Sequence, residues 1–150
     1  MLESNYPNLF LDAGISSAHD REKYVNRLDA VREVEGIDTA DIFGVGERGT
    51  GSNLDLYVVH RRAITLACER GVFKKRITVD PICATPSLAR LRATQEGFKG
   101  TELTITGHDA AGSEVLKITW GLGGPDWVEP LVLRQREHLF RVISAAMDRV

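Results

Sequence analysis

The spacing of apolar residues changes twice along this chain, from a helical period to strand alternation and back. From Tyr24 to Val34, apolar residues fall three or four positions apart, which is the spacing of one face of an α-helix. The serine pair at 16–17 can cap such a helix, and Gly36 follows its last turn, where glycine commonly ends helices. The sequence therefore predicts a helix over 17–35.

Between residues 40 and 120, apolar and polar positions alternate as they do in half-buried strands. The run FKKRITVDPI, for example, places Phe73, Ile77 and Val79 on one face. Several short strands separated by turn residues are typical of a curled antiparallel sheet or a small barrel. Seven strands are expected, at 40–46, 54–59, 62–70, 73–82, 87–94, 101–107 and 113–120.

The helical period returns after the Gly-Leu-Gly-Gly-Pro break at 121–125. Between Leu131 and Val150 the apolar residues form one stripe, and such a stripe has to be buried, most simply on an open face or end of the sheet. Residues 1–15 show no clear period and are expected to be a loose arm. The predicted fold is one α+β domain over 1–150, in which a seven-stranded antiparallel sheet carries a C-terminal capping helix and an extra N-terminal helix.

Composition narrows the functional classes. With 150 residues and a net charge of −2, the chain has no general attraction to nucleic acid, so no nucleic-acid partner is expected. Cys68 and Cys83 form no paired motif, and the four histidines show no metal-binding spacing. The chain has no apolar run of the roughly 20 residues that cross a bilayer, and no signal-peptide pattern at its start. These features predict a cytoplasmic protein without a disulfide or a metal.

The segment FGVGERGTGSNLDLYVV resembles the metal-binding loop of a nucleotidyltransferase. The resemblance places Gly44 and Val45 on the family's Gly-Ser pair, Asn53 and Asp55 on its two carboxylates, and Asp80 on a third acidic position. It implies catalysis with Mg²⁺ and a nucleotide, and it requires a helix after the Asp-x-Asp strand. Val45 has no hydroxyl and Asn53 has no charge, so the match departs from the pattern at both positions. A minimal or degenerate nucleotidyltransferase is the alternative hypothesis.

A second resemblance covers residues 40–150. The run LYVVHRRAITLACERGVFKKRITVDPI, the later GTELTITGHDAAGSEVLKITW hairpin and the final helix together resemble a bacterial pleckstrin-homology-like domain. This resemblance implies a non-enzymatic binding module without a cofactor, which recognises a protein partner or an anionic lipid headgroup or ligand. Under it, Gly44, Gly46, Gly49 and Gly51 serve a mobile connection between strands. The helix at 17–35 lies outside the family pattern, and a homodimer contact is one role open to it.

Basic side chains are the candidate binding residues, because they would attract an anionic surface. The alternative is a solvated basic strand edge that prevents edge pairing. These side chains belong to the loop before the second strand, to the following turn and to the next loop. A turn and a loop at the two ends of one strand need not form a single patch. Aromatic residues offer a separate feature: Trp120, Trp127, Phe140 and Met147 fit either the apolar core or a groove between the sheet and the final helix, which would suit a peptide or a partner helix. The candidate basic residues are Arg48, Arg61, Arg62, Lys74, Lys75 and Arg76.

Overall fold

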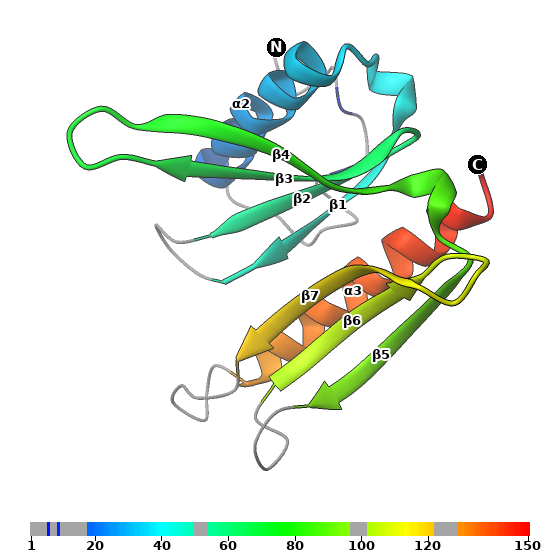
Figure 1. Ribbon diagram of the computed structural model, residues 1–150. Coiled ribbons are helices and arrows are strands. Elements are labelled where there is room, and N and C mark those ends of the chain that lie inside the picture. The colour runs from blue at the N-terminus through cyan, green and yellow to red at the C-terminus, as the bar shows by residue number, and fades with distance from the viewer. Residues whose placement is uncertain (1–5, 7–8, 10–17, 50–53, 97–101, 122–128) are drawn as a thin grey trace.

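The structure, a computed structural model, describes residues 6, 9, 18–49, 54–96, 102–121 and 129–150 (Figure 1). Both expected helices are present, and within the described residues neither is both long and apolar enough to cross a bilayer. The expected strands are also present, with ends shifted by a few residues. The elements are α2 (Ala18–Glu35), η2 (Thr39–Asp41), β1 (Ile42–Arg48), β2 (Asp55–His60), β3 (Ala63–Arg70), β4 (Arg76–Ala84), η4 (Thr85–Ser87), β5 (Arg90–Glu96), β6 (Glu102–His108), β7 (Glu114–Gly121) and α3 (Glu129–Met147).

The seven antiparallel strands form two sheets, which confirms the α+β class but not the single curled sheet. One sheet has the order β1-β2-β3-β4 and the other has the order β5-β6-β7. The division falls after β4, where the short 3-10 turn η4 carries the chain into β5. Pro86 lies in that turn, and proline has no N–H with which to continue a strand ladder. The break between sheets is therefore local, at residues 85–89.

Strand β2 separates two apolar cores and is buried over its whole length. Leu56 and Val58 pack with the apolar residues of α2, whereas Tyr57 and Val59 pack with α3 and the second sheet. The period-two alternation of this run is thus real, but both faces are covered. In Figure 1, α2 lies against one face of the four-stranded sheet and α3 lies along the three-stranded sheet.

Two glycines of β1 allow α3 to approach the strand closely. A Cβ atom on Gly44 would lie 2.5 Å from Cγ1 of Val142, and one on Gly46 would lie 2.6 Å from Cδ1 of Leu139. Real Cβ contacts are not this short, so the helix occupies the space that side chains would need. The expectation that these glycines belong to a mobile loop is wrong for both. Gly49 follows β1 with a φ of +93°, and Gly51 lies outside the described residues.

The arm expected over residues 1–15 is not loose at Tyr6. This ring is buried in the core beneath α2, and its hydroxyl donates a hydrogen bond to the carboxylate of Asp29. Burial, reinforced by Asp29, raises the pKa of Tyr6 to about 12. Arg32 donates to the same hydroxyl at 3.3 Å and lies over the ring. Tyr6 therefore fastens the start of the chain to α2.

Candidate functional site

The six candidate basic residues do not form one patch. Arg61 and Arg62 occupy the β2–β3 turn, while Lys74, Lys75 and Arg76 lie beyond the other end of β3. The eight residues of β3 separate the two groups, which corresponds to roughly 25 Å of extended strand. The expected separation of the turn from the loop is confirmed.

The arginines of the β2–β3 turn hold secondary structure elements together. The Nη1 atom of Arg62 donates to the carbonyl oxygen of Glu35 at the end of α2, at 2.6 Å. Arg61 pairs with Asp41 at 3.4 Å and lies over the ring of Phe43. A hydrogen bond from the backbone N–H of Asp38, assisted by Arg61, lowers the pKa of Asp41. These two guanidinium groups are committed to contacts within the fold.

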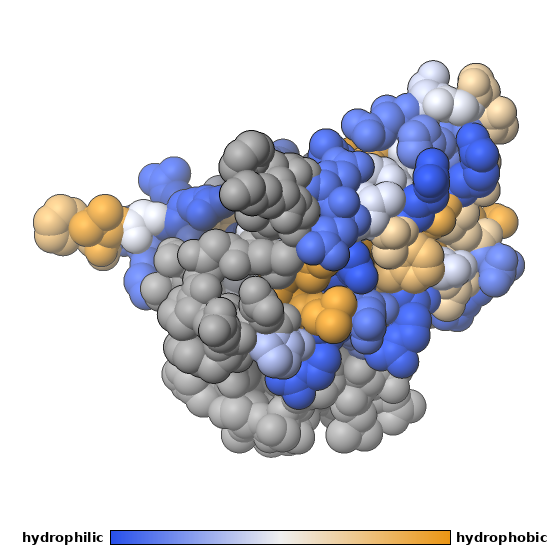
Figure 2. Space-filling view, turned by 90° about the horizontal axis from the view of Figure 1, so that it is seen from below, coloured by the Kyte–Doolittle hydropathy of each residue, from blue (hydrophilic) through white to orange (hydrophobic). Residues whose placement is uncertain are grey.

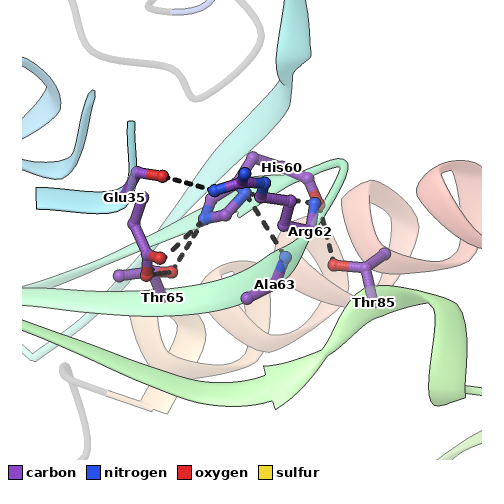
Figure 3. A network of polar contacts seen from close by, with 6 residues as sticks. All are labelled: Glu35, His60, Arg62, Ala63, Thr65 and Thr85. Carbon is purple, nitrogen blue, oxygen red and sulfur yellow. Dashed lines mark hydrogen bonds and ion pairs between the residues drawn. The ribbon is translucent and has the colours of Figure 1, made fainter. Parts of the chain in front are cut away.

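Beside this turn, His60 is fully buried in a network of polar contacts (Figure 3). Its Nδ1 atom accepts hydrogen bonds from the backbone N–H groups of Arg62 and Ala63, both at 3.3 Å. The neutral ring therefore carries its proton on Nε2, which lies 2.9 Å from the Thr65 hydroxyl. Thr65 in turn donates to Glu35 at 3.1 Å. Burial lowers the pKa of His60; Glu35 opposes this shift and Arg62 adds to it.

Arg48 is engaged at the opposite end of β2. Its Nη2 atom lies 2.7 Å from the carboxylate of Asp55, and the guanidinium lies over the ring of Tyr57. Tyr57 is buried, which raises its pKa to about 12. Asp55 is itself nearly covered, so Arg48 balances a charge that the fold has removed from water.

The described residues do not show the arrangement that the alternative catalytic hypothesis requires. Asp55 pairs with Arg48, whereas Asp80 lies exposed on β4. Asn53 lies outside the described residues. The segment 63–70 is strand β3 and not the required helix, and no three His, Cys, Asp or Glu residues in the described part of the chain are grouped to hold a metal. The topology gives the nucleotidyltransferase hypothesis no support.

The β3–β4 hairpin continues past the rest of its sheet as a two-stranded arm. The ladder between β2 and β3 ends at the pair Leu56 and Ala67, but β3 and β4 remain paired as far as Arg70 and Arg76. We call residues 68–78 the arm and residues 71–75, which join its two strands, the tip. Figure 1 shows the arm projecting beyond β1 and β2.

Apolar side chains at the tip are fully exposed. Val72 is 89% exposed and Phe73 is 102% exposed, and Figure 2 shows an apolar end on a projection of the molecular surface. The expectation that Phe73 belongs to a strand face is wrong, because β4 begins only at Arg76. Gly71 makes the turn with a φ of +117°, and a Cβ atom there would lie 2.2 Å from the carbonyl oxygen of Lys74. Glycine is therefore required at this position.

Positive charges surround this apolar tip. Residues 70–76 contain four cationic side chains and no carboxylate, and all four of these side chains are exposed. None of them forms an ion pair with the described residues, in contrast to Arg48 and Arg61. The sequence marked three of these cations as candidates but missed Arg70 and the two apolar residues. The four are Arg70, Lys74, Lys75 and Arg76.

The base of the arm is fastened to α2 and across its own two strands. Arg27 of α2 is buried and lies 3.7 Å from the carboxylate of Glu69. Across the hairpin, Cys68 Sγ lies 3.2 Å from the hydroxyl of Thr78, which also donates to the Cys68 carbonyl oxygen at 3.3 Å. The tip is thus held away from the body of the protein on a supported base.

Comparisons with known proteins add no family to this geometry. No protein-family model matches the chain, and no curated protein or solved structure is significantly similar to it.

Proposed function

We propose that this protein is a non-enzymatic binding module that attaches peripherally to anionic membrane surfaces through the arm. The observation that carries the proposal is the pair of fully exposed apolar residues, Val72 and Phe73, held between Arg70 and the Lys74–Arg76 run. The resemblance to pleckstrin-homology-like domains, which also implies a binding module, remains a hypothesis about ancestry. The membrane-binding proposal rests on the arm and does not require this resemblance.

Physical chemistry favours a bilayer over water for this tip. Phe73 has its whole surface in water, and burying such a side chain is worth about 1.5–3 kcal/mol. Each Lys or Arg near an anionic leaflet adds about 1 kcal/mol. An aromatic ring beside long cationic side chains suits the membrane interface, where the ring enters the headgroup region and the charges remain among the phosphates.

The shape of the arm favours recognition of surface charge over recognition of one headgroup. The four cations lie on a projecting hairpin, and a stereospecific ligand site is normally concave. Because the whole chain carries a charge of −2, the attraction has to act locally, at the tip. The cytoplasmic leaflet, which is rich in anionic lipids, is the surface that this arrangement fits.

Vesicle sedimentation tests the proposal. The full chain should bind vesicles that contain 30% phosphatidylserine and should not bind neutral phosphatidylcholine vesicles. The double variant Lys74→Glu/Arg76→Glu should reduce binding more than about 30-fold, because it replaces two attractions of about 1 kcal/mol each with repulsions. Phe73→Ser should reduce vesicle binding about 10-fold, because the apolar ring no longer enters the bilayer interface. The ring is fully exposed in the free protein, so this change should leave the fold intact.

A matched control separates the effect of charge reversal in the arm from the effect of a change in net charge. Arg90→Glu/Arg92→Glu makes the same change of charge at exposed positions on β5, and we expect binding to phosphatidylserine to stay within about threefold of the unmodified chain, since these charges lie away from the membrane contact. The proposal fails if the unmodified chain does not bind anionic vesicles, or if the β5 variant loses as much binding as the arm variant.

A further inference from the structure

Strand β5 has a free edge that lies next to α3. It pairs with β6 on one side through an unbroken register from Arg90 to Glu96, and within the described residues no strand pairs with its other side. The other sheet edges are different. Strand β4 carries Pro81, the register of β1 is interrupted and α3 packs against it, and the register of β7 against β6 also shifts. Proline and irregular register are the usual means of blocking edge pairing.

Backbone hydrogen bonds of β6 show which groups of β5 point to this free edge. The carbonyl oxygen of His108 accepts from the N–H of Ala89, and the N–H of Asp109 donates to Ser113 before β7, so the even-numbered residues of β6 are directed to β5. Their partners are the even-numbered residues of β5, from Arg90 to Glu96. Because backbone direction alternates along a strand, Leu91 and Ala93 present their N–H and C=O groups away from β6. The carbonyl oxygen of Thr94 also accepts a hydrogen bond from Arg136 of α3 at 3.0 Å.

A shallow trough accompanies this edge. It has a volume of about 360 Å³ and is formed by Ala93 of β5 with Arg136, Glu137, Phe140 and Arg141 of α3. Among the aromatic and methionine residues considered for a groove, Phe140 lines the trough, whereas Trp120 is buried in the core and Met147 packs against it. Trp127 lies outside the described residues.

The charges of the trough favour an acidic occupant. Two arginines of α3, Arg136 and Arg141, line it, and Arg141 is exposed. Among the described residues, Glu137 is the single acidic residue that lines the trough.

We infer that the edge of β5 and the trough beside α3 bind an extended acidic segment of a partner protein. The segment would add to β5 as a fourth strand and would exchange backbone hydrogen bonds with Leu91 and Ala93. Its apolar side chains would lie on Phe140 and Ala93, and its carboxylates would lie near Arg136 and Arg141. This inference is independent of the proposed membrane attachment, because the arm and β5 belong to different sheets.

A labelled peptide tests the inference directly. The probe is acetyl-Gly-(Glu-Val)₃-Gly-amide carrying fluorescein, with the Lys-Val peptide of the same length as its counterpart. Fluorescence anisotropy should show saturable binding of the acidic peptide to the full chain and none of the basic peptide. Amide hydrogen exchange at Leu91 and Ala93 should slow when the acidic peptide binds, because their N–H groups gain partners. An acidic peptide that does not bind would overturn the inference.

Paired variants separate backbone pairing from charge. Ala93→Pro removes an outward N–H and should abolish binding, whereas Ala93→Gly keeps it and should weaken binding less than about fivefold. Arg141→Glu should weaken binding about tenfold, and Arg134→Glu, an exposed change on the same helix outside the trough, should leave it within about twofold. Melting curves show whether the proline variant folds. If it does not fold, the comparison of Arg141→Glu with Arg134→Glu tests the inference. Equal affinities in that pair would contradict the inference.

Discussion

Gly46→Val is expected to lower the free energy of unfolding by about 3 kcal/mol, at the upper end of the usual cost of overpacking a core. A Cβ atom at this position would lie 2.6 Å from Cδ1 of Leu139 and 3.0 Å from its Cβ. The Cδ1 atom belongs to a flexible end, but the Cβ atom is fixed to the backbone of α3. The helix would therefore have to move away from β1. Urea unfolding followed by circular dichroism measures the effect.

The sign of this result is informative because strand propensity acts in the opposite direction. Valine favours extended backbone more than glycine does, so a Gly→Val change at an open strand position should be neutral or slightly stabilising. Gly121 provides that control, since no atom lies within 4 Å of its added Cβ. If Gly46→Val and Gly121→Val had the same small effect, the close approach of α3 to β1 would be wrong.

Much of the fold follows from periodicity. The helices expected at 17–35 and 131–150 and the seven expected strands correspond to elements of the structure, because their apolar spacing reflects which faces are buried. The glycines of β1 show where such reasoning ends. Gly44 and Gly46 look like loop residues, but they are explained by a helix almost a hundred positions later in the chain. A single sequence does not reveal such a long-range contact.

The candidate site was less predictable than the fold. The basic residues were visible as a composition feature, yet Arg48, Arg61 and Arg62 proved to be occupied by partners within the fold. Pairing of this kind depends on tertiary geometry, so charge alone does not separate a structural arginine from a free one. Phe73 was assigned to a strand face because its spacing to Ile77 fits a period of two. The glycine at 71 and the start of β4 at Arg76 instead place it at the tip of the arm.

His60→Leu is expected to lower the free energy of unfolding by about 2–3 kcal/mol at pH 7.5. Leucine fills the space but leaves the N–H groups of Arg62 and Ala63 and the hydroxyl of Thr65 without this partner, and an unsatisfied buried polar group costs about 1–3 kcal/mol. His60→Asn keeps an acceptor for the two N–H groups and should recover part of the loss. Urea unfolding of the three proteins measures both effects.

The same residue should make stability depend on pH in a predictable direction. Burial lowers the pKa of His60 in the folded state below its ordinary value of 6.5, so the unfolded chain takes up the proton first. The contribution of His60 is therefore complete above about pH 6.5 and decreases as the pH falls toward the folded-state pKa, with a slope of at most about 1.4 kcal/mol per pH unit. His60→Asn carries no titrating group at this position, and the other histidines and the carboxylates are common to both proteins. The stability difference between the two proteins should consequently be largest above pH 7 and narrow toward pH 5. A difference that stays constant over this range would show that His60 is not held neutral by the backbone donors of the β2–β3 turn.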